Sequence, residues 1–321
     1  MKIEGDSLAA DVRNALRGVC MGCADVVPGV SGGTVALILG IYERLVTAIS
    51  HVDRVAFEHV RRHEWSKLVK HLDLRFLATL GAGLISGVIA MTLIVGLLLN
   101  NATTRALTFA LFFGAIFASA ILVARLIQTA TGMQSIRCVS LGLIGAVFAY
   151  WVSTLQNSTA SPPPSHAYIF FSGCIAICAM ILPGISGAMI LLVLGVYEHL
   201  TDIPRDFLHG NNISEGLLTI AVFGGGCSIS LVLFSKLLRW LLSHHHATTM
   251  SLLCGFMFGA LRKLWPFQKD TAPDIEKFKE KTFEVFLPQQ FDGQVFAVCA
   301  AALIAAGVVF AVDYWIKRVR A

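Results

Sequence analysis

The chain of 321 residues is 56% hydrophobic and only 14% charged, with a mean hydropathy of +0.72 and a formal net charge of +5. This composition leaves too little polar surface for a soluble globular protein and excludes that class. Several apolar runs could cross about 30 Å of hydrocarbon as helices, for example Leu74–Leu99, Thr104–Val123 and Gln294–Val312. We therefore expect an all-α polytopic membrane protein that basic loops orient in the lipid bilayer, with no nucleic-acid partner.

The first predicted element, residues 13–49, is an apolar segment that two pairs of helix-breaking residues interrupt. The stretch before it lacks the apolar core and cleavage site of a removable signal peptide. Pro28-Gly29 and Gly32-Gly33 divide the segment into arms of about 14 and 17 residues, each short for a complete span. We interpret the arms as a re-entrant hairpin, which enters the membrane and leaves on the same side. Such irregular backbone is tolerated only where protein or a watery cavity surrounds it.

The rest of the first half, residues 1–155, is predicted to contain an amphipathic cytoplasmic segment, residues 51–75, and three spans. A proline-rich linker, Gln156–His166, follows this half. Its three consecutive prolines cannot continue a helix, so the linker marks the boundary between two halves.

The second half, residues 167–321, repeats this order. Its predicted re-entrant hairpin, residues 167–201, contains PGISGAMILLVLGVYEHL (Pro183–Leu200), in which ten of eighteen positions are identical to PGVSGGTVALILGIYERL (Pro28–Leu45). Three small-residue motifs follow each copy in the same order, which indicates an internal duplication. Three spans again complete the half.

The distribution of basic residues tests the hairpin interpretation. If both hairpins are re-entrant, sixteen Lys and Arg residues of the termini and short loops lie inside and two lie outside, with the long loop 262–281 set aside. If each hairpin segment crossed the membrane once, the same short loops would divide nine to nine. The positive-inside rule favours re-entry, with both termini cytoplasmic and the linker outside. Because three spans is an odd number, the second half is an inverted repeat of the first, as in alternating-access transporters.

The hairpin tips are candidate anion sites. The second arm of each hairpin begins at a Ser-Gly pair, where the first turn of a helix offers unpaired N–H groups and a partial positive charge. We expect the turn to be made by Pro28, Gly29, Pro183 and Gly184, and a phosphate or carboxylate to be bound by Ser31, Gly32, Gly33, Thr34, Ser186 and Gly187. The second copy has Ala188-Met189 where the first has Gly33-Thr34, so we expect the first hairpin to bind the anion more strongly.

Three acidic residues near the hairpins are candidates for coupling or gating. Asp25 precedes the first break, and Glu43 and Glu198 occupy equivalent positions in the two copies. Acidic residues inside a membrane are costly and usually functional, so Asp25 could bind a coupling proton or sodium ion. Glu43 and Glu198 could equally be residues of a helix end at the membrane interface. We expect no metal and no other cofactor, because the single C-x-x-C motif, Cys20 to Cys23, has no second pair of ligands.

Two other functions would use the same residues. Gly29-Val30-Ser31-Gly32 could be the G-x-S-G motif of an intramembrane serine protease, but no histidine falls inside a predicted span to act as the base. An ion-coupled carrier of a small water-soluble anion would also use inverted hairpins with an anion site. Whether the cleft opens to lipid or to water would decide between this carrier and a lipid transporter.

The paired motifs PGVSGGT…LGIYERL and PGISGA…LGVYEHL resemble the signature of the bacterial polyprenyl-phosphate transporters, a family long catalogued as a domain of unknown function. The resemblance extends from about Arg17 to the last span. It implies a flippase of the bacterial cytoplasmic (inner) membrane that returns undecaprenyl phosphate, or a related polyprenyl phosphate, from the outer to the inner leaflet for envelope polymer synthesis. Such a protein would bind no catalytic cofactor, would not be an enzyme, and could form a homo-oligomer.

Overall fold

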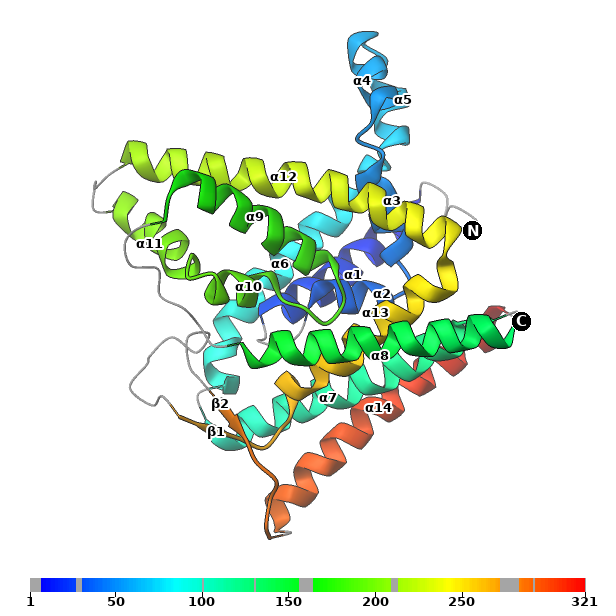
Figure 1. Cartoon of the computed structure of the whole chain (residues 1–321), viewed down its shortest axis with the longest axis vertical. Helices are drawn as coiled ribbons and strands as arrows, with labels where there is room; N and C mark the ends of the chain where they lie inside the picture. The colour runs from blue at the N-terminus through cyan, green and yellow to red at the C-terminus, as the bar shows by residue number, and fades with distance from the viewer. Residues whose placement is uncertain are drawn as a thin grey trace.

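The computed structural model describes residues 7–26, 31–99, 101–129, 131–155, 164–208, 213–271, 283–290 and 292–320. These residues are almost entirely helical (Figure 1). In chain order the elements are α1 (Leu8–Val26), α2 (Gly32–Ile38), α3 (Tyr42–Ser50), α4 (Arg54–Arg61), α5 (Trp65–His71), α6 (Leu74–Leu99), α7 (Ala102–Leu126), α8 (Gly132–Thr154), α9 (His166–Ile181), α10 (Gly187–Val193), α11 (Tyr197–Leu208), α12 (Ile213–His244), α13 (His246–Ala260), the 3-10 turn η1 (Leu261–Leu264), β1 (Gln268–Asp270), β2 (Phe283–Val285) and α14 (Gly293–Arg320).

Five helices of the described part are long and apolar enough to cross a membrane: α6, α7, α8, α12 and α14. The pair α2 and α3 would add a sixth if it were one broken span, but its two helices meet at an angle of 117°. Many large apolar side chains on these helices are exposed, including Ile85, Leu143, Leu233 and Leu303. A multi-pass membrane protein explains this exposure, because lipid covers those faces.

Each half pairs its first helix with its first long span in the same way. In the first half α1 packs on α6, where Gly18 and Gly22 lie against α6 and Gly83 and Gly87 lie against α1. In the second half α9 packs on α12 through Gly173 and Gly226. The contacts of α1 and α6 advance along the two helices together, so these helices run parallel. Figure 1 shows α9 and α12 also running in the same direction. The glycines allow this close approach, because a side chain at those positions would clash with the facing backbone.

Helices α7, α8, α13 and α14 pair across the two halves. Helix α8 packs on α13, with Gly142 against Gly255 and Ala146 against Gly259. Helix α7 packs on α14 in the same exchanged manner, and both pairs again run parallel. Helices α7 and α8 of the first half thus contact α14 and α13 of the second half. This exchange of partners joins the halves into one bundle with a shared apolar core, which includes Tyr42, Phe76, Leu253 and Met257.

The second arm of each hairpin is two helices, whereas the sequence predicted one arm of about 17 residues. Gly40 ends α2 and Gly195 ends α10, with φ values of +67° and +68°. In both turns the glycine N–H donates to the carbonyl three residues back, and the following N–H, of Ile41 or Val196, donates five residues back, at 3.0 Å. This is a Schellman cap, for which glycine is the preferred residue.

Two smaller features lie outside the helical bundle. Helices α4 and α5, in the predicted amphipathic segment 51–75, project away from it at the top of Figure 1. Strands β1 and β2 form a short antiparallel ribbon at its lower left, with Lys269 opposite Glu284. The all-α prediction missed this ribbon, because strands of three residues carry little periodic signal.

Candidate functional site

The tip of the first hairpin is the start of α2, which Ser31 caps. The Ser31 side chain is 1% exposed, and its Oγ accepts the N–H of Gly33 at 3.2 Å. The hydroxyl is also 3.4 Å from the carbonyl oxygen of Met180, to which it donates. An N-cap serine satisfies one of the open donors of a helix start. None of the described histidines bonds to Ser31, so the arrangement seen here is a helix cap.

A carboxylate already lies on this helix start. Oδ1 of Asp25, near the end of α1, accepts the N–H of Gly32 at 2.6 Å. A Cβ atom at Gly32 would lie 2.5 Å from Oδ2 of the same side chain, so only glycine permits this approach. The first turn of α2 therefore holds an anionic group, which in this structure is the protein's own Asp25 carboxylate.

The two hairpins meet directly at this point. Thr34, which is fully buried, accepts the N–H of Gly184 at 2.7 Å through its Oγ1. The Tyr42 hydroxyl donates to the carbonyl of Ile181 at 3.1 Å, and a Cβ atom at Gly33 would lie 2.7 Å from the same carbonyl oxygen. Thr34, Gly33 and Tyr42 therefore hold the first tip against the end of α9 and the second tip.

The second tip is built differently. Pro183 and Gly184 form its turn, and Gly184 has a φ of +85°, a conformation that favours glycine. Ser186 is the N-cap residue of α10 but makes no side-chain cap bond, unlike Ser31. Gly187 lies against the carbonyl of Ala176 on α9. The two tips therefore differ in their caps, and the hydroxyls of the first tip already have hydrogen-bond partners. Pro28 and Gly29 lie outside the described residues.

The two candidate glutamates lie away from the tips. Glu43 is in the first turn of α3, and its Oε1 is 3.0 Å from Nε2 of His246 at the start of α13. It therefore connects the first hairpin to a helix of the second half. The equivalent Glu198, in the first turn of α11, is exposed. Only Asp25 among the three candidate acids lies at a hairpin tip.

A polar cluster of His51, Asp53 and His71, next to the end of α3, was not predicted from the sequence. Nε2 of His71 is 3.0 Å from Oδ1 of Asp53, and Nδ1 of His51 is 2.8 Å from the carbonyl of His71. Partial burial, with the positive charge of Arg239 beside it, lowers the pKa of His51. Partial burial opposes ionisation of Asp53, but the N–H groups of α4 and the His71 side chain hold the pKa of Asp53 below its usual value. An aspartate before a helix is an N-cap signal, so the sequence could have predicted that Asp53 caps α4.

Fold and site together define a multi-pass membrane protein whose two similar halves meet at broken helices. A family model described as VCA0040-like, undecaprenyl phosphate translocase-like, matches residues 21–282. The chain belongs to this family, which confirms the resemblance drawn from its paired motifs.

Two relatives carry the name polyprenyl-phosphate transporter. The protein of Vibrio cholerae serotype O1 is 34% identical over 254 residues, which cover 79% of this chain and 77% of the relative. The protein of Staphylococcus aureus is 28% identical over 257 residues, which cover 79% of this chain and 86% of the relative. No solved structure was found to match the chain.

Proposed function

We propose that this protein transports undecaprenyl phosphate, or a related polyprenyl phosphate, from the outer to the inner leaflet of the bacterial cytoplasmic membrane. Its family and the names of its two relatives support the substrate class. The phosphate headgroup binds where the hairpin tips meet, at Ser31, Gly32, Gly33 and Thr34 with Ser186 and Gly187 opposite. The prenyl chain stays in the surrounding lipid.

The observation that carries this proposal is the bond from Gly32 N–H to the Asp25 carboxylate. A buried helix start that holds one anionic group can hold another, because phosphate and carboxylate oxygens are recognised by the same donors. Asp25 and the phosphate then compete for one place. A proton or sodium ion that neutralises Asp25 frees the Gly32 N–H, which couples ion binding to headgroup binding.

The helix pairs support a re-entrant, inverted arrangement. Because α1 and α6 run parallel, a chain that starts on the cytoplasmic side must return to that side before α6 begins. The same holds for α9 and α12 on the opposite side, if successive spans alternate in direction. Two hairpins that enter from opposite faces and touch at their tips are the geometry expected for alternating access.

The test is transport of labelled undecaprenyl phosphate in proteoliposomes from pH 5.5 to 8.5. A charge-assisted hydrogen bond contributes about 1.5–3 kcal/mol, so removal of the competing charge should change transport about ten-fold or more at pH values where Asp25 is ionised. We expect transport by the unmodified protein to change with pH and transport by Asp25→Asn to lose this change. Glu58→Gln, which neutralises an exposed acid on α4, is the matched control and should keep the change with pH.

A second measurement in the same vesicles separates the lipid transporter from a carrier of small anions. Labelled inorganic phosphate should not accumulate, and prenol without phosphate should not compete. Uptake of inorganic phosphate without movement of the lipid would contradict the proposed substrate. If Asp25→Asn keeps the pH profile of the unmodified protein, Asp25 does not compete with the phosphate at the tip. That result would not contradict the proposed substrate.

A further inference from the structure

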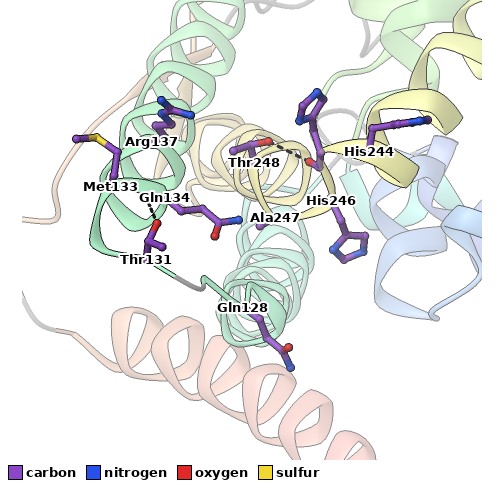
Figure 2. A pocket seen from close by; sticks show the side chains of 10 residues that line it. Gln128, Thr131, Met133, Gln134, Arg137, His244, His246, Ala247 and Thr248 are labelled. Carbon is purple, nitrogen blue, oxygen red and sulfur yellow. Dashed lines mark hydrogen bonds between the residues drawn. The ribbon is translucent and has the colours of Figure 1, made fainter.

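A cavity of about 690 Å³ lies between the two halves, where α7 and α12 end and α8 and α13 begin. The end of α7 and the first turns of α8 form one wall, and the turn between α12 and α13 forms the other (Figure 2). It is lined by Gln128, Thr131, Met133, Gln134, Arg137, His244, His245, His246, Ala247 and Thr248. No part of either hairpin tip belongs to this lining.

The lining is rich in hydrogen-bond donors and contains no acidic residue. Arg137 offers a guanidinium group, and within the described residues it makes no ion pair. The two carboxamides and the Thr131 hydroxyl add donors on the wall formed by α7 and α8, and imidazoles of the His244–His246 turn add donors on the other wall. The Thr248 hydroxyl already donates to the carbonyl of His245, and Nε2 of His246 is already bonded to Glu43. In Figure 2 the Gln134 side chain points from α8 across the cavity toward Ala247. Donors on both walls suit a tetrahedral anion with several oxygens.

The helices that meet here add to the positive potential. Helices α8 and α13 run parallel and both begin at the cavity, so the positive ends of both helix dipoles face it. Thr131 caps α8 by accepting the N–H of Gln134 at 3.2 Å, whereas His245 at the start of α13 makes no side-chain cap bond. Arg137 and both helix N-termini therefore favour an anionic ligand.

We infer that this cavity binds a phosphate group, held chiefly by Arg137 with donors from the His244–His246 turn. The phosphate group is either the headgroup of the transported lipid or free phosphate. The first of these sources rests on the proposed function. The contact of His246 with Glu43, at 3.0 Å, joins the cavity wall to α3. The cavity is therefore linked to the first hairpin without including its tip. A released headgroup would meet this second site at the basic, inner end of the bundle.

The experiment titrates the full chain in detergent, at constant ionic strength, with inorganic phosphate and separately with farnesyl phosphate as a short prenyl phosphate. We expect Arg137→Gln to weaken binding of at least one probe about ten-fold or more, because a bidentate charge-assisted contact is lost. The matched control, Arg62→Gln, removes an exposed arginine elsewhere and should change affinity by no more than about two-fold. Arg137→Lys keeps the positive charge and should recover much of the affinity.

The two probes distinguish the sources. Weakened binding of both probes assigns the cavity to the phosphate group itself, and weakened binding of farnesyl phosphate alone assigns it to the lipid headgroup. Identical isotherms for Arg137→Gln and Arg62→Gln with both probes would overturn the site. Asp25→Asn, which tests the transport proposal, leaves the cavity lining intact, and Arg137→Gln, which tests the cavity, leaves the hairpin tips intact. Failure of one proposal can therefore be told apart from failure of the other.

Discussion

At the scale of single residues, the hairpin tips depend on polar groups that the bundle buries. Thr34 is the clearest case, because its hydroxyl joins two residues that are 150 positions apart. The sequence suggested that this hydroxyl contacts the ligand, and in the structure it accepts a backbone N–H of the opposite hairpin. The same side chain is therefore expected to affect both folding and binding.

Thr34→Val should destabilise the protein. Valine has nearly the same shape but cannot accept the Gly184 N–H, and a buried unsatisfied donor costs about 1–3 kcal/mol. We expect a lower midpoint of thermal unfolding in detergent. Thr92→Val is the control, since Thr92 is exposed and bonds only to the carbonyl of Val88 in its own helix. Equal midpoints for the two variants would mean that the bond between the hairpins adds no stability.

At the scale of helices, close packing through glycine holds the pairs together. Apolar side chains give little driving force between helices in lipid, so contact between backbones and good packing matter more than burial. The pair α8 and α13 is the strongest example, because Gly255 lies directly against Gly142 of the other half.

Gly255→Ala should separate α8 from α13. Its Cβ would clash with the carbonyl oxygen of Gly142, and overpacking of this kind typically costs about 1–3 kcal/mol. Gly225→Ala on α12 is the matched control, because nothing lies within 4 Å of the added atom. Thermal unfolding in detergent should show a loss of stability for the first variant and none for the second. A stable Gly255→Ala protein would show that this contact relaxes easily.

At the scale of the whole molecule, membrane orientation follows from charge. We predict that the segment 54–75, the segment 236–246 and both termini face the cytoplasm, and that the linker 156–166 faces outward. Single cysteines at His63 and Ser158 of a cysteine-free protein should therefore react with a membrane-impermeant reagent from opposite sides. Labelling of both positions from the same side would contradict the inverted arrangement.

The sequence by itself determined the membrane class, the duplicated motif and the family. These properties depend on composition, on local helix breakers and on a duplicated motif, all of which can be read without knowing which helices touch. The sequence could also have predicted the Schellman turns at Gly40 and Gly195, because a glycine that follows an apolar arm is a local signal of a helix end.

Only the tertiary structure decided which groups meet. The bond of Gly32 to Asp25, the contact of Thr34 with Gly184 and the exchange of partners between α8 and α13 depend on how the helices pack. The cavity at Arg137 is likewise formed by segments that lie more than 100 residues apart in the chain. Local sequence patterns set the length and apolar face of each helix, but in lipid the choice of partner depends on detailed shape, which no local pattern records.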